Sequence, residues 1–185
     1  MTAEPAVQWA MTAVFGGLGV RSLWWLVAAR LPLAVAEHLL HLGMSLVMVA
    51  MMWPWWVALP VLPQVAFFAL GAGFFAALAG WRALEPGRGA DAGALAAHAA
   101  MMLAMVWAVA VMGRGPAAHH AAHGPHPTLT DGAAAWGAAL VVALVAGTVV
   151  LLVHGAGRER GGADHLAGAL MSGGTVVMCV LMLTG

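Results

Sequence analysis

Six apolar stretches, each close to 20 residues long, constrain this chain more than any other feature of its sequence. A helix of about 20 apolar residues crosses the hydrocarbon core of a bilayer, so we predict spans at about 7–27, 34–53, 61–81, 92–112, 133–154 and 165–184. Only 8% of the 185 residues are charged, against roughly a quarter in soluble domains. The sequence therefore predicts one all-α transmembrane domain over residues 1–185, a polytopic membrane protein in contact with the lipid bilayer.

The arginines predict the orientation of these helices. Six of the seven lie near or after the ends of the first, third and fifth stretches, and only Arg114 lies at the opposite ends. Positive residues collect on the cytoplasmic side, so we expect a multi-pass plasma-membrane protein whose two termini and 113–132 loop are extracytoplasmic. The net charge is zero, and nothing points to a nucleic-acid partner.

Consecutive stretches pair into three helical hairpins, and the second member of each hairpin is rich in methionine. These three stretches hold eleven of the thirteen methionines, and each has a histidine near its start. Similar spacings recur as His38, Met44 and Met51, as His98, Met105 and Met112, and as His165, Met171 and Met178. This pattern indicates a weak internal threefold repeat.

Two of these stretches also share the spacing His-x-x-Met-x-x-x-Met. At 100° per residue, positions i, i+3 and i+7 fall on one face of a helix, which places His98, Met101 and Met105 in one stripe. The second stretch repeats it with His41, Met44 and Met48. In the last stretch the shared face carries Met171, Met178 and Met182.

These side chains suggest a site for copper. Thioethers select Cu(I), and imidazole binds copper in either redox state. If the three stripes face a common axis, they form stacked rings of neutral ligands. The alternative is that the methionines are flexible packing residues and the histidines mark helix starts at the membrane interface.

The outer loop carries a second metal-binding signal, a histidine tract among Ala, Gly and Pro. Its members are His119, His120, His123 and His126. Imidazoles without thiolate suit Cu(II), Zn or Ni. The alternative is a solvated loop of low complexity that binds no metal. The single cysteine, Cys179, excludes an intrachain disulfide and is either a further sulfur ligand or a small packing residue.

The runs EHLLHLGMSLVM (37–48) and MMWP (51–54) carry a resemblance to a known group. The chain resembles the small actinobacterial integral membrane proteins grouped as a family of unknown function. That resemblance implies a six-helix fold in the plasma membrane and supplies no activity.

The Met-x-x-x-Met pairs 44 and 48, 101 and 105, and 178 and 182 are similar to the pore motif of Ctr-type copper transporters. In that family three chains each contribute one such helix beneath an outer segment rich in Met and His. This likeness covers only the motif.

We therefore expect a membrane protein that binds copper for uptake, for transfer to a donor or acceptor protein, or for sensing. Two alternatives stay open. One is a haem-binding electron-transfer subunit with two of His38, His41, His98 and His165 as axial ligands. The other is a scaffold or assembly partner, and a homo-oligomer is compatible with each of the three. No nucleophile elbow, phosphate-binding loop or CxxC motif occurs in the sequence, so we do not expect an enzyme.

Overall fold

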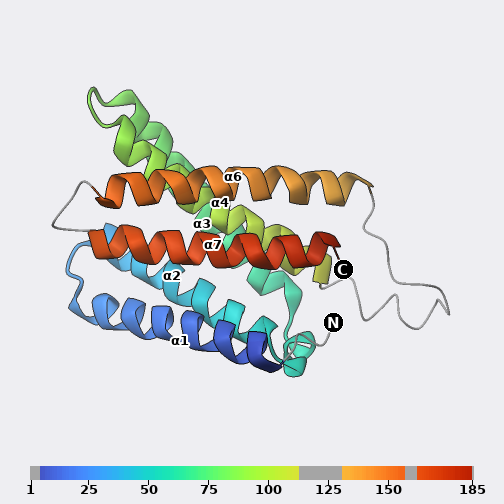
Figure 1. Ribbon diagram of the computed structural model, residues 1–185. Coiled ribbons are helices and arrows are strands. Elements are labelled where there is room, and N and C mark those ends of the chain that lie inside the picture. Colours follow the sequence, from blue (N-terminus) through green and yellow to red (C-terminus); the bar gives the residue numbers. More distant parts are fainter. Residues whose placement is uncertain (1–4, 113–130, 157–161, 185) are drawn as a thin grey trace. The chain divides into compact units, whose positions relative to one another are not determined.

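The computed structural model describes residues 5–112, 131–156 and 162–184, and this part of the chain is helical, without a strand. Six long helices and one short 3-10 helix follow one another along the chain (Figure 1). They are α1 (Pro5–Ala28), α2 (Pro32–Met51), η1 (Pro54–Ala58), α3 (Val61–Leu84), α4 (Gly89–Met112), α6 (Asp131–Ala156) and α7 (Gly162–Thr184).

Each long helix has the length and composition of a membrane span. The mean hydropathy of the most apolar window rises from 1.3 in α1 to 2.5 in α6, so even the least apolar helix qualifies. The prediction of an all-α protein with six spanning helices is confirmed. Five of the six helices are a few residues longer than the predicted stretches, as where α3 continues to Leu84. The helix α2 has the predicted length but begins at Pro32 and ends at Met51, two residues earlier at each end than predicted.

Proline and glycine set several of the helix boundaries. Pro32 and Pro54 stand in the first turns of α2 and η1, where the missing N–H of proline costs no hydrogen bond. Between α3 and α4 the chain turns through Gly87, whose φ of 79° is readily adopted only by glycine. The chain then enters α4 at Gly89.

The chain divides into two compact units, residues 1–59 and 60–185. In the first unit, α1 and α2 form a hairpin. Gly19 of α1 packs on Ser45 of α2, since a Cβ added at the glycine would lie 3.3 Å from the serine Cβ. At the end of the hairpin, Gln8 Nε2 donates to the carbonyl oxygen of Met52 at 2.7 Å. The rings of Trp9 and Trp53 meet edge to face there, 5.2 Å apart.

The second unit contains α3, α4, α6 and α7. The helix pairs α3–α4 and α6–α7 are hairpins, and α4 packs against each of the other three helices. Half of the spanning window of α4 is buried, against 22% in α3 and in α6 and 39% in α7. The fourth and sixth predicted stretches, α4 and α7, are therefore the more buried helices of this unit. The common axis of the three methionine stripes stays a prediction.

Candidate metal centre

His98 is a buried histidine of α4, with 7% of its surface exposed. Its Nδ1 lies 2.7 Å from the carbonyl oxygen of Ala94, one turn earlier on the same helix. A carbonyl only accepts hydrogen bonds, so Nδ1 carries the hydrogen and donates it. Nε2 then holds the lone pair of the neutral ring. This is the arrangement in which a backbone carbonyl fixes the tautomer and orientation of a metal-binding histidine.

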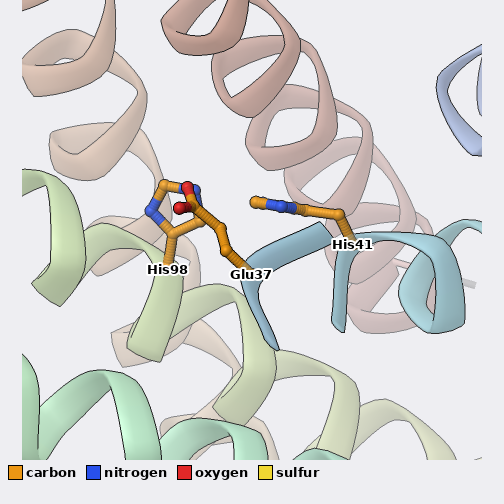
Figure 2. Close-up of side chains that lie close together, drawn as sticks. All are labelled: Glu37, His41 and His98. Carbon is orange, nitrogen blue, oxygen red and sulfur yellow. The ribbon is translucent and has the colours of Figure 1, made fainter. Parts of the chain in front are cut away.

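Residues of α3 and α7 lie beside this imidazole, which is drawn on α4 in Figure 2. The ring of Phe75 on α3 packs against it with centroids 5.2 Å apart. A Cβ added at Gly168 of α7 would lie 3.7 Å from Nε2 of His98 and 3.3 Å from Cδ1 of Leu151 on α6. Gly168 therefore lets α7 approach the nitrogen that holds the lone pair.

Two methionines follow His98 and Gly168 at the same level. The helices α4 and α7 run in the same direction (Figure 1). A step of three residues advances each helix by about 4.5 Å, from His98 to Met101 on α4 and from Gly168 to Met171 on α7. Met101 is 0% exposed and Met171 is 1% exposed. One imidazole nitrogen and two thioethers therefore occur within about one turn of the α4–α7 pair.

Buried sulfur-containing side chains continue along α4 and α7 toward the other end of the unit. Met102 and Met105 on α4 are fully buried, and Met178 on α7 is 7% exposed. The neighbouring thiol of Cys179 is also buried. Met182 is only partly buried, so it is the most exposed predicted ligand of α7 among those with described side chains.

Two buried hydroxyls on α7 were not among the predicted site residues. Ser172 Oγ donates to the carbonyl oxygen of Leu144 on α6 at 3.1 Å, and Thr175 Oγ1 donates to the carbonyl oxygen of Met171 at 2.9 Å. The first bond ties α7 to α6, and the second stays within α7. Their hydrogen bonds give them a packing role, and the sequence signal for it is the small-residue pair Gly168 and Ser172.

The stripe of α2 belongs to the first unit and includes a carboxylate. Glu37 stands one turn before His41, and an oxygen of the acid lies within 4.8 Å of a ring nitrogen of the histidine (Figure 2). His41 is 9% exposed, and Met44 and Met48 beyond it are 0% and 1% exposed. Glu37 was not among the predicted ligands, and its place four residues before His41 is the sequence signal for it.

The remaining predicted ligands have mixed outcomes. Met51 is buried at the end of α2, and His38 is half-buried near its beginning. Met112 and His165 stand in α4 and α7, but their side chains lie outside the described part of the structure. The predicted loop ligands also lie outside the described residues: His119, His120, His123 and His126.

A family model described as a domain of unknown function, DUF5134, matches residues 33–182, which is more than half of the chain. The chain belongs to this family. In this DUF5134 protein the matched region begins in α2 and ends in α7, so it contains both histidine and methionine stripes. No curated protein and no solved structure matches the chain significantly.

Proposed function

We propose that this protein binds Cu(I) inside the membrane, with Nε2 of His98 and the thioethers of Met101 and Met171 as ligands. One observation carries the proposal: the hydrogen bond from Nδ1 of His98 to the Ala94 carbonyl leaves Nε2 as the coordinating nitrogen, on the side where Gly168 lets α7 come close. The two methionines follow at the next level of the same two helices.

The chemistry of the ligand set favours Cu(I) over harder ions. Thioethers are soft ligands, and a neutral imidazole accepts copper in either redox state. Neutral ligands also avoid the high cost of burying a carboxylate in hydrocarbon. Both thioethers are buried inside the protein and do not face lipid, which also supports a role as Cu(I) ligands.

In this proposal the protein lies in the plasma membrane and takes up, transfers or senses copper. The outer histidines collect the metal, and the stripe of α2 is a further holding position along the route. A protein that donates or accepts copper is the partner that such a route requires. The loop must then be extracytoplasmic, as the arginine pattern predicts.

The binding experiment uses purified protein loaded with Cu(I) in the presence of a competing chelator that removes weakly bound metal. We expect bound copper in the wild type and its loss in Met101→Leu/Met171→Leu. Met11→Leu is the matched control, since Met11 lies on α1 outside the stripes. No copper in the wild type, or equal copper in both variants, would contradict the proposal. A Soret band in the visible spectrum would instead show haem.

The orientation has its own test. A cysteine introduced by Ala121→Cys should react with a membrane-impermeant thiol reagent in intact cells. The wild type is the control, because its one cysteine, Cys179, is buried. Labelling that occurs only after permeabilisation would overturn the orientation and the capture role of the loop.

A further inference from the structure

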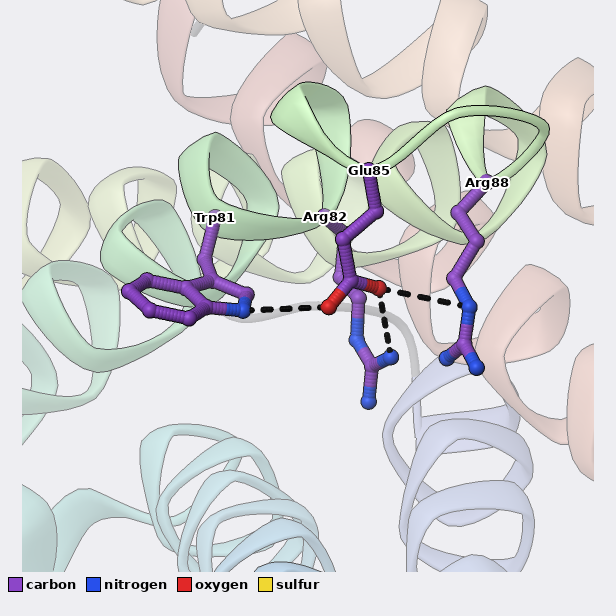
Figure 3. A network of polar contacts seen from close by, with 4 residues as sticks. All are labelled: Trp81, Arg82, Glu85 and Arg88. Atoms are coloured by element: carbon purple, nitrogen blue, oxygen red, sulfur yellow. Dashed lines mark hydrogen bonds and ion pairs between the residues drawn. The ribbon is translucent and has the colours of Figure 1, made fainter.

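The turn between α3 and α4 carries a polar cluster outside the metal centre. The carboxylate of Glu85 accepts hydrogen bonds from Trp81 Nε1 at 3.1 Å and from Arg82 Nη1 at 3.0 Å, and it forms an ion pair with Arg88, whose Nε lies 3.2 Å from Oε2 (Figure 3). One arginine precedes the turn and the other follows it. A single acid therefore holds two guanidinium groups in place.

Each guanidinium has five N–H donors, and Glu85 uses only one nitrogen of each. Arg88 is bound through Nε, so both of its terminal nitrogens are directed elsewhere. Figure 3 shows the guanidinium groups of Arg82 and Arg88 reaching beyond the carboxylate on the same side of it. Half of the Arg88 side-chain surface is exposed, so the cluster is accessible from outside.

The cluster lies at the depth of lipid headgroups. The spanning segment of α3 ends at Leu84 and that of α4 begins at Asp91, so Glu85 and Arg88 fall just outside both. Trp81, in the last turns of α3, is 68% exposed, as expected of a tryptophan in the interfacial belt. Phosphate groups of the bilayer occupy this level.

The charges of the cluster suit an anion. Desolvation raises the pKa of Glu85, but the hydrogen bonds from Arg82 and Trp81 and the charges of the two arginines outweigh it and hold that pKa below its ordinary value. The carboxylate is therefore ionised at neutral pH, and two arginines against one acid leave one net positive charge. Asp91 in the first turn of α4 is the next acid along the chain. It stands on the spanning helix and takes part in none of the three contacts at Glu85.

We propose that Arg82 and Arg88, held by Glu85, bind the phosphate of one anionic phospholipid, with Trp81 packing beside its glycerol and acyl region. Guanidinium forks match the geometry of phosphate oxygens, which an ammonium does not. The site goes beyond copper binding and does not depend on it. By the arginine pattern it faces the cytoplasmic leaflet, where anionic lipids concentrate.

The test counts bound lipids by native mass spectrometry of the full chain released from nanodiscs. The nanodiscs contain phosphatidylglycerol and phosphatidylcholine with the same acyl chains. We expect the wild type to retain phosphatidylglycerol more than fivefold over phosphatidylcholine, because one net positive charge near a membrane surface gives about fivefold and the guanidinium forks add to it. Arg82→Lys/Arg88→Lys keeps the charge and removes the forks, so its preference should fall to about fivefold. Arg30→Lys is the matched control at another helix end and should retain the wild-type preference.

Two outcomes would overturn the site. If the Arg82→Lys/Arg88→Lys variant prefers phosphatidylglycerol as strongly as the wild type does, the preference comes from positive charge near the membrane alone and not from a guanidinium site. Displacement of the lipid by millimolar inorganic phosphate would show a site for free phosphate and not for a lipid. Equal thermal unfolding of the wild type and the lysine variant checks that the fold is intact.

Discussion

The helices α2 and α4 carry the same His-x-x-Met-x-x-x-Met spacing but differ four residues before the histidine. In α4 that residue is Ala94, whose carbonyl oxygen accepts a hydrogen bond from Nδ1 of His98. In α2 it is Glu37, whose carboxylate lies within 4.8 Å of a ring nitrogen of His41. The residue one turn before the histidine is therefore an alanine in one stripe and a glutamate in the other.

This difference teaches that the spacing alone does not define the chemistry of a stripe. In the proposed site, the backbone carbonyl of Ala94 orients the imidazole of His98, and the ligands are one nitrogen and two thioethers. A carboxylate adds a hard oxygen, which suits Cu(II) or Zn. We infer that the α4–α7 pair is selective for Cu(I) and that α2 tolerates divalent ions.

The largest expected difference between the two helices is in the effect of replacing their histidines on Cu(I) affinity. Replacing His98 with Ala should weaken Cu(I) binding by at least about 100-fold, because removal of a ligand costs more than removal of the group that orients it. His41→Ala should leave the tight Cu(I) affinity near that of the wild type. A chelator competition titration measures both, and equal losses in the two variants would remove the distinction between the helices.

The methionines should give the next largest effect. Met101→Leu/Met171→Leu conserves volume at a cost of less than about 1.5 kcal/mol per swap, so the protein should fold while losing Cu(I). Met44→Leu/Met48→Leu is equally conservative and should retain more of the metal. The measurement is the fraction of copper that each double variant keeps at a fixed chelator concentration. If the α2 variant keeps less copper than the α4–α7 variant, the main site is on α2.

Substituting Glu37 should affect divalent ions only. Glu37→Gln replaces the anionic oxygen beside His41 with a neutral amide, so Zn binding to α2 should fall while Cu(I) binding stays unchanged. Isothermal titration with each metal separates the two effects. A parallel loss of Cu(I) would mean that the acid serves the soft site as well.

The smallest effect on retained copper should come from the outer loop. Replacing His119, His120, His123 and His126 with Ala should leave the Cu(I) affinity of purified protein intact and slow only copper accumulation from low external concentrations. Uptake of isotopic copper by intact cells measures this. Loss of retained Cu(I) in the purified variant would place the tight site in the loop.

The fold followed from the sequence because span length and hydropathy act locally. Six stretches of apolar residues required six helices, and the prolines and glycines between them limited the connections. Burial of Met101 and Met105 on one face of α4 also followed from helical periodicity.

The contacts of the site could not be read from the sequence. Nothing in the spacing of His98 and Met101 indicates that Phe75 packs on the imidazole or that Gly168 of α7 approaches Nε2. Those contacts depend on which helices pair across long separations in the chain. The cluster at Glu85 depends on side-chain contacts across the turn, which the positions of Arg82 and Arg88 in the sequence do not indicate.

X-ray absorption at the copper K-edge tests the central claim most directly. The wild type is loaded with one equivalent of Cu(I), so that the tightest position fills first. The account predicts one imidazole nitrogen and two sulfur neighbours, with the sulfur signal lost in Met101→Leu/Met171→Leu and kept in Met11→Leu. A first shell of nitrogen and oxygen alone, or a sulfur signal unchanged by the double substitution, would contradict it.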